Sequence, residues 1–283
     1  MKKLLLLAVA LALPLLAQPK GKLFIIGGGS RPAYMMEKFI QYAGGYDAKI
    51  IIIPNASSVP RSEVWDHASE FEKMGCKNVK ALYFGPGEAD KPENLKEVEG
   101  AKAIFFSGGD QVKLKNEVGD GKLFHLIKEV YEKGGIVGGT SAGAAVMSKV
   151  MITGEELIVK DSEAVFYTVT ANNVETKEGF GFLTDVIIDQ HFLVRKRQNR
   201  LIAATLEHNL PGIGIDESTA IVVEEGRYFT VLGESGVLII NPLTGKRLKD
   251  HNGLVSGRDM TMHLLMNGDR YDMKTNTILN DQH

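Results

Sequence analysis

The sequence predicts an α/β protein with a mostly parallel sheet flanked by helices and with antiparallel strands added in the C-terminal part. Through most of the chain, short apolar runs alternate with longer amphipathic stretches. The runs are continuous rather than alternating, which is typical of parallel strands buried on both faces. Beyond residue 213 the runs are separated only by short turns that contain glycine, which indicates antiparallel strands.

Each element is expected from its own local pattern. Continuous apolar runs predict buried strands at residues 23–26, 50–53, 79–84, 103–106, 135–138 and 186–189. Apolar residues at helical spacing, or long amphipathic stretches, predict helices at 32–42, 61–74, 122–133 and 195–208. Antiparallel edge strands on the same sheet are expected at 220–223, 228–232 and 237–240. No internal repeat or Pro/Ser-rich linker interrupts the pattern, so residues 18–283 are expected to form one domain.

The N-terminus has the layout of a secretory signal peptide. Lys2 and Lys3 precede an apolar run over residues 4–16, and polarity begins at Gln18. The run is shorter than the roughly 20 residues that a membrane span needs. We expect residues 1–17 to be a signal peptide cleaved after Ala17, with no stable membrane anchor afterwards, and the mature protein to be secreted or periplasmic.

Bulk composition excludes some classes of function. The 33 Lys and Arg residues nearly balance 35 Asp and Glu residues, giving a net charge of −2. No global basic field is present to attract a nucleic acid, so none is expected as a partner. The single cysteine, Cys76, excludes an intrachain disulfide and is expected to be a small buried apolar side chain.

The strongest chemical signal is a serine between small residues at the end of a predicted strand. Gly139, Ser141 and Gly143 form a Gly-x-Ser-x-Gly pattern between the strand at 135–138 and a small-residue helical stretch. Such a sharp strand-to-helix turn exposes the serine hydroxyl above the sheet as a nucleophile. An oxyanion would then accept hydrogen bonds from the backbone N–H of Ala142 and from the loop that contains Gly109.

Among the seven histidines, His191 is the candidate general base. It follows the apolar strand at 186–189, and side chains at the carboxyl ends of such strands line the ligand crevice of parallel sheets. Arg195, Arg197 and Arg200 come directly after it, where a helix is expected to begin. Cations there oppose the helix dipole, so we expect them to bind a carboxylate. The alternative is a solvated basic helix face.

Taken together, these segments resemble the cyanophycinase branch of the serine peptidases, which also includes aspartyl dipeptidase. The similarity extends over nearly all of the mature chain. The residues that carry it are Gly108-Gly109-Asp110-Gln111, Gly138 to Ala144, Asp189-Gln190-His191-Phe192, Arg195-x-Arg197-x-x-Arg200-Leu201, Gly212 to Glu217, Met262 to Leu265 and Gly268 to Asp272.

The resemblance implies a class I glutamine amidotransferase-like, flavodoxin-like fold and hydrolysis without a metal or other cofactor. It implies that Ser141 attacks the substrate and that His191 moves the proton. It also implies a set of residues that bind the substrate or surround a polyaspartate backbone and its carboxylates: Gln111, Asp189, Gln190, Arg195, Arg197 and Arg200.

The acidic third member of the site is open at the sequence level. The family places an acid between the serine and the histidine, and Glu156 is the first choice in that segment. Glu155, Asp161 and Glu163 are alternatives there, and Glu217 is a further one because it follows another predicted buried strand.

Three functions are weighed. The first is hydrolysis of cyanophycin, a polyaspartate that carries arginine on its side-chain carboxyls, to β-aspartyl-arginine through an acyl-enzyme. The second is a dipeptidase or isoaspartyl peptidase that acts on short aspartyl peptides. A non-catalytic binding protein on the same fold is the third, and it would lack the intact serine turn; a glutaminase would need a cysteine at position 141. The sequence leaves the oligomeric state open, a homodimer included.

Overall fold

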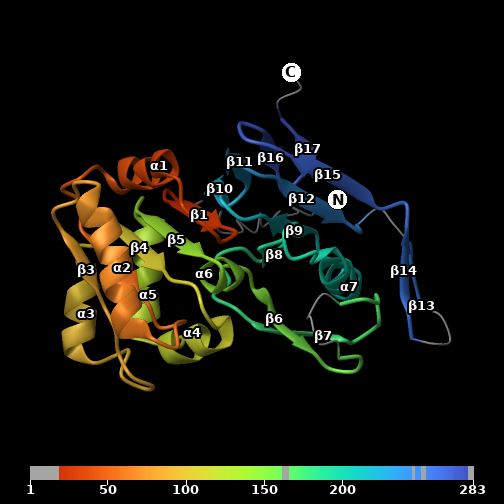
Figure 1. Cartoon of the computed structure of the whole chain (residues 1–283), viewed down its shortest axis with the longest axis horizontal. Helices are drawn as coiled ribbons and strands as arrows, with labels where there is room; N and C mark the ends of the chain where they lie inside the picture. The colour runs from red at the N-terminus through yellow and green to blue at the C-terminus, as the bar shows by residue number, and fades with distance from the viewer. Residues whose placement is uncertain (1–18, 161–165, 244–245, 250–252, 280–283) are drawn as a thin grey trace, which may run out of the picture.

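The computed structural model describes residues 19–160, 166–243, 246–249 and 253–279. The expected signal peptide lies outside the described residues. Within them, no helix is both long enough and apolar enough to span a bilayer. Figure 1 shows the helices of the N-terminal half around one sheet and the C-terminal strands on the other side of the molecule.

The main sheet has nine strands in the order β17-β16-β11-β10-β1-β5-β4-β2-β3 (Figure 1). Its parallel part consists of β1 (Lys22–Ile26), β2 (Ile50–Ile53), β3 (Val79–Ala81), β4 (Ala103–Phe106) and β5 (Ile136–Thr140). The antiparallel part consists of β10 (Thr219–Glu224), β11 (Tyr228–Gly233), β16 (Arg270–Asp272) and β17 (Thr277–Ile278). The predicted parallel sheet with antiparallel additions is therefore confirmed.

A second sheet, in the order β15-β12-β9-β8, was not predicted. It contains β8 (Ile187–Gln190) and β9 (Gly212–Ile215), which are parallel, and β12 (Val237–Asn241) and β15 (Thr261–Leu265), which are antiparallel. The expectation that the strand at 237–240 joins the main sheet is therefore wrong. The apolar composition of each run predicts that the strand is buried, but it does not predict which of the two sheets contains the strand.

Two hairpins complete the strands. One is formed by β6 (Val150–Glu156) and β7 (Val174–Glu178), and the other by β13 (Lys246–Lys249) and β14 (Val255–Arg258). In β6 and β7 polar side chains interrupt the apolar residues, so no continuous run marks either strand in the sequence.

Helices cover both faces of the parallel strands (Figure 1). They are α1 (Ala33–Ala43), α2 (Pro60–Lys73), α3 (Pro92–Val98), α4 (Gln111–Val118), α5 (Lys122–Glu132), α6 (Ala142–Ala145) and α7 (Gln198–His208). Alternate residues of β2 separate the two cores: Ile50 and Ile52 pack with α1, whereas Ile51 and Ile53 pack with α5 and α6. Cys76 is buried in the α1 core, as predicted, and burial raises the pKa of its thiol.

Helix α7 begins three residues later than predicted. His191 and Lys196 adopt left-handed backbone angles, with φ of 47° and 52°, so the chain after β8 turns instead of continuing into a helix. The Asp216 carboxylate accepts hydrogen bonds from the backbone N–H groups of Leu193 and Val194, both at 3.0 Å, and holds this turn in place. Arg197 thereby becomes the residue that precedes the helix.

Candidate active site

Five strands from the two sheets end near one another at their carboxyl ends. Ser141 follows β5, His191 follows β8 and Glu217 lies just beyond β9. Two glycine loops, residues 27–29 after β1 and 107–110 after β4, lie beside them. Ligand crevices of open α/β sheets lie beyond such strand ends, so the architecture marks this edge as the candidate site.

Ser141 lies on a strained turn, as predicted. Its backbone angles are φ 54° and ψ −111°, a conformation that non-glycine residues rarely adopt. The turn is held because the Ser141 N–H donates to the Ile26 carbonyl at 3.1 Å. Its glycine neighbours are required by close backbone approach: a Cβ on Gly143 would lie 2.9 Å from the Phe106 Cβ, and one on Gly139 would overlap the Gly143 carbonyl.

The His191 ring is fixed against this serine. Its Nε2 lies 2.9 Å from the Ser141 Oγ, and its own backbone N–H donates to the Gly27 carbonyl at 2.8 Å. The ring packs on the backbone of Gly28, whose φ is 123° and on which a Cβ would overlap the imidazole. The loop after β1 therefore supports the ring in the position from which it can take the serine proton.

The acid beside His191 is Glu217, whereas Glu156 was the first choice from sequence. The His191 Nδ1 lies 2.5 Å from Glu217 Oε1. Glu156 is buried at the end of β6, where its carboxylate accepts a hydrogen bond from Asn173 Nδ2 at 3.3 Å. Glu155 is an exposed residue of the same hairpin. Asp161 and Glu163 lie outside the described residues.

The Ser141–His191–Glu217 arrangement has the geometry of a nucleophile, a base and an orienting acid. A proton on Nδ1 is donated to the Glu217 carboxylate, which leaves the Nε2 lone pair for the serine hydroxyl. Burial lowers the pKa of His191 most strongly; the Glu217 carboxylate opposes that shift, and the Arg195 and Arg197 guanidinium groups reinforce it. The net pKa lies below the ordinary value for histidine, so the ring is neutral at neutral pH.

The charge of Arg195 is predicted to set the acidic limit of activity. With His191 as the predicted base, only its neutral form is active, so kcat/KM is expected to fall as the pH drops through the His191 pKa, which lies below the ordinary value for histidine. Replacing Arg195 with glutamine removes the first of the two cations that lower this pKa, so the acidic limb should move to higher pH. A pH profile of kcat/KM measures it, with Arg258→Gln as a control on β14; an unmoved or lower limb would contradict the assignment.

The backbone groups predicted to hold an oxyanion flank the serine. Ala142 is the first residue of α6, so its N–H has no acceptor within the helix. A Cβ on Gly108 would lie 3.3 Å from the Ser141 Cβ, which shows how closely the loop after β4 approaches the serine. Gly109 has a φ of 131° and packs on the Ala56 carbonyl, a conformation open to glycine. The roles of Gly109 and Ala142 stay predictions.

Of the two glutamines predicted to bind the substrate, Gln190 contacts Ser141 and Gln111 contacts the β6–β7 hairpin. The Gln190 Oε1 lies 3.5 Å from the Ser141 Oγ, so this side chain borders the reacting hydroxyl. The Gln111 amide nitrogen donates to the carbonyls of Ile152 at 2.8 Å and Thr153 at 2.7 Å. Gln111 therefore ties α4 to the β6–β7 hairpin, and only its amide oxygen is left for a substrate group.

Asp189 and Arg200, both predicted to bind the substrate, are paired with each other inside the protein. Their side chains form a two-point ion pair with each other, in which Arg200 Nε donates to Asp189 Oδ2 at 2.8 Å and Nη2 donates to Oδ1. Both side chains are almost fully buried. Asp189 and Arg200 lie on either side of His191 in the sequence, and only the three-dimensional structure reveals that their charges neutralise each other.

Breaking this buried pair is expected to destabilise the fold. Replacing Arg200 with methionine leaves the Asp189 carboxylate buried without its partner, which costs about 3–5 kcal/mol in free energy of unfolding. Urea denaturation measures the loss, with exposed Arg258→Met as the control. The double change Asp189→Asn with Arg200→Met should recover part of it, because no charge is then left buried. A loss below 1 kcal/mol in the single variant would contradict the buried pairing.

Arg197 is a half-buried cation that contacts the same segment. One of its Nη atoms donates to the Gln190 carbonyl at 2.7 Å, and its buried Nε has no hydrogen-bond partner among the described residues. Burial, reinforced by the neighbouring Arg200, lowers the pKa of Arg197 to about 10. Arg195 is half exposed, with its Nε 4.0 Å from Glu217 Oε1. These two arginines stay candidates for binding a carboxylate.

Sequence reasoning missed the residues that position the site. Gly28 and Gly29 pack against His191 and Glu217, and Asp216 fixes the turn that follows His191. The signal was present: three consecutive glycines directly after a buried strand are typical of close backbone approach. Within the described ranges, no group of three or more His, Cys, Asp or Glu side chains could hold a metal ion.

The chain is similar to known peptidases over most of its length. Residues 23–231 match the family model of peptidase family S51. A cyanophycinase of Geminocystis herdmanii is 35% identical, over 90% of this chain and 95% of that protein. The cyanophycinase of Synechococcus elongatus is 34% identical, over 92% of this chain and 81% of that one.

Solved structures share the fold. A crystal structure of a peptidase from an acI-B1 Actinobacterium superposes with a TM-score of 0.64 at 23% identity, covering 90% of this chain and 98% of that chain. A putative peptidase E protein from Listeria monocytogenes superposes with a TM-score of 0.51 at 17% identity, covering 76% and 99%. These matches cover most of the chain and are not confined to the strand ends that surround Ser141. The chain belongs to peptidase family S51 and is a serine-type peptidase.

Proposed function

We propose that this peptidase hydrolyses cyanophycin to β-aspartyl-arginine, with Ser141 as nucleophile, His191 as general base and Glu217 as the orienting acid. The observation that carries the catalytic assignment is the contact chain from Ser141 Oγ to His191 Nε2 at 2.9 Å and from Nδ1 to Glu217 Oε1 at 2.5 Å. The relatives that are 34–35% identical and named cyanophycinases support the substrate.

In the proposed mechanism, the Ser141 oxygen attacks the carbonyl carbon of the scissile aspartyl amide while His191 Nε2 takes the hydroxyl proton. The carbonyl oxygen becomes negative and accepts hydrogen bonds from the backbone N–H groups of Ala142 and Gly109. His191 then gives the proton to the leaving nitrogen as the C–N bond breaks, which leaves an ester on Ser141. Water, deprotonated by the same imidazole, hydrolyses that ester and regenerates the serine.

Glu217 acts through His191. Its carboxylate fixes the tautomer with the proton on Nδ1 and stabilises the imidazolium that forms during each proton transfer. The backbone support of Gly28 and Gly29 keeps the imidazole and this carboxylate aligned with the serine, so that little reorganisation is needed at the moment of reaction.

The charge of the site fits an acidic substrate. Asp189 neutralises Arg200, which leaves Arg195 and Arg197 to attract carboxylates beside the serine. Arginine binds carboxylates with paired, charge-assisted hydrogen bonds, and the Arg197 Nε, which has no partner within the described ranges, would gain the most from such a ligand. A polyaspartate decorated with arginine presents a carboxylate on every arginine that is attached through its α-amino group.

Export is proposed as well. Two lysines, an apolar run and Ala17 precede the first described strand in the order typical of a cleaved leader. We propose that the enzyme acts outside the cytoplasm, on polymer released there.

Incubation of the mature protein with cyanophycin granules tests the substrate. Release of β-aspartyl-arginine is the expected result, followed by chromatography and mass spectrometry, with short α-aspartyl and isoaspartyl dipeptides tested in parallel. Rapid turnover of the dipeptides with no release from the polymer would replace the proposed activity with that of a dipeptidase or isoaspartyl peptidase.

A further inference from the structure

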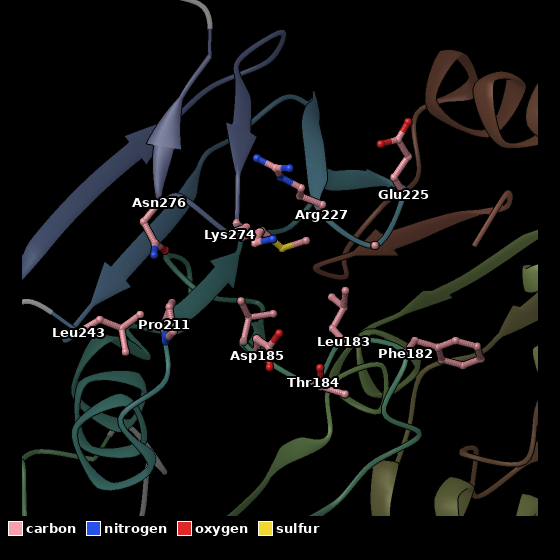
Figure 2. Close-up of a pocket in the computed structure, with 13 residues that line it drawn as sticks. Phe182, Leu183, Thr184, Asp185, Pro211, Glu225, Arg227, Leu243, Lys274 and Asn276 are labelled. Atoms are coloured by element: carbon pink, nitrogen blue, oxygen red, sulfur yellow. The ribbon is translucent and has the colours of Figure 1, made fainter. Parts of the chain in front are cut away.

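A cavity lies at the opposite edge of the sheets from Ser141. Its volume is about 430 Å³, within the range of roughly 300–1,000 Å³ that small-molecule sites occupy. It is bordered by the segments that lead into the amino ends of β8 and β9, by the β10–β11 turn and by the β16–β17 turn (Figure 2). His191 and Glu217 follow the carboxyl ends of β8 and β9, so the candidate active site and this cavity lie at different edges.

Apolar side chains line the cavity at both ends of the view in Figure 2. They come from the segments before β8 and β9, from just beyond the end of β12 and from the β16–β17 turn: Phe182, Leu183, Val186, Pro211, Leu243 and Met273. Apolar side chains among the polar ones suit the aliphatic stem of a long polar side chain, because the stem leaves water while its charged end stays solvated or paired.

Opposite charges face each other across the cavity. Figure 2 shows Asp185 and Thr184 on one side and Lys274 and Asn276 on the other, while the Glu225 carboxylate points away. In the described part of the chain, neither Asp185 nor Lys274 forms an ion pair.

Two other lining residues, Asn276 and Arg227, form hydrogen bonds with neighbouring side chains. Asn276 accepts from the Tyr271 hydroxyl through its oxygen, at 3.4 Å, which leaves its amide hydrogens available. Arg227 is held by the Asp272 carboxylate in a two-point ion pair, which lowers the pKa of Asp272. Among the described residues, the cavity thus offers an acid, Asp185, and a base, Lys274, that form no ion pair, together with the amide group of Asn276 as a donor.

We propose that this cavity binds an arginine unit that carries both its guanidinium and a free carboxylate, and that it anchors the polymer away from the cleavage site. Asp185 accepts hydrogen bonds from the guanidinium, the apolar lining side chains contact the methylene stem, and Lys274 with Asn276 binds the carboxylate. The proposal rests on the proposed function, because cyanophycin presents this pair of charges on every repeating unit.

An anchor on a different edge has a kinetic consequence. A chain held in the cavity raises the effective concentration of its other units near Ser141 without occupying the crevice itself. The effect requires a polymer long enough to reach both sites, so short soluble substrates should not benefit from it.

The test uses Asp185→Asn with Lys274→Met, both exposed positions, and Glu93→Gln with Lys96→Met on α3 as the matched control. Binding to granules is measured by sedimentation in a Ser141→Ala background, and turnover of a soluble dimer of the β-aspartyl-arginine unit is measured in the active enzyme. We expect granule binding to weaken about tenfold or more in the cavity variant alone, with soluble turnover unchanged within twofold.

The outcomes separate the inference from the proposed function. Unchanged granule binding in the cavity variant overturns the anchor, whether or not the enzyme cleaves the polymer. Absence of polymer cleavage by the unmodified enzyme overturns the proposed function, even if the variant changes binding. The free product β-aspartyl-arginine carries the same guanidinium and carboxylate as the polymer unit, so its binding is measured by calorimetric titration. If the cavity variant no longer binds this dipeptide but still binds granules, the cavity is a product site and the anchor is overturned.

Discussion

Replacement of Ser141 with alanine is expected to lower kcat for cyanophycin by on the order of 10⁵- to 10⁶-fold, the size of the effect when a nucleophile of this type is removed. The Ser141 Oγ is the atom that lies 2.9 Å from His191 Nε2, so without it no acyl-enzyme forms. The backbone donors and the arginines remain, so substrate should still bind. Release of β-aspartyl-arginine and equilibrium binding to granules measure the two effects separately.

Alanine at position 141 is not expected to unfold the protein, because its methyl group occupies space that the serine side chain already fills. Ser256→Ala, at an exposed position on β14, is the matched control and should retain full activity. Activity of Ser141→Ala within tenfold of the unmodified enzyme would sink the nucleophile assignment. Loss of folding would be detected by circular dichroism, and loss of binding by the granule assay. Loss of both would call for Ser141→Cys, which keeps a small polar side chain on the same turn.

The parts of the site that sequence predicts are those with local signals. Ser141 is marked by small neighbours and by its place between a buried strand and a helix, and close backbone contacts explain the glycines at positions 139 and 143. His191 is marked by the buried strand that precedes it. Its position next to the serine follows because both residues lie at carboxyl ends of parallel strands, although those strands belong to different sheets.

The parts that sequence could not predict depend on pairing between distant side chains. Asp189 and Arg200 each look like ligand-binding groups until the turn after β8 brings them together inside the protein. Glu217 is adjacent in sequence to Asp216, and no periodicity distinguishes the acid that orients the base from the acid that holds the loop. Likewise, the run at residues 237–240 predicts a strand, but its membership of the second sheet is set by pairing with β9 and β15.

Replacing each glutamate in turn with glutamine distinguishes the role of Glu217 from that of Glu156. Glu217→Gln is expected to lower kcat by about 10⁴-fold, because an amide in place of the orienting carboxylate favours the wrong imidazole tautomer and no longer stabilises the imidazolium. Glu156→Gln should leave kcat nearly unchanged, since the Glu156 carboxylate contacts Asn173 in the β6–β7 hairpin. Steady-state kinetics on the polymer, at saturating concentration, measures both.

A pH profile separates an orienting role of Glu217 from a merely structural one. The Glu217 carboxylate raises the pKa of His191 against the effect of burial, so its removal should lower that pKa further and move the acidic limb of the remaining activity to lower pH. The shift is opposite in sign to that of Arg195→Gln, although both side chains lie beside the same imidazole. A general loss of folding would reduce activity at every pH and leave the midpoint in place. If Glu156→Gln instead produced the larger kcat loss together with a shifted limb, the hairpin acid would have to reach His191 during turnover, and the assignment of Glu217 would be wrong.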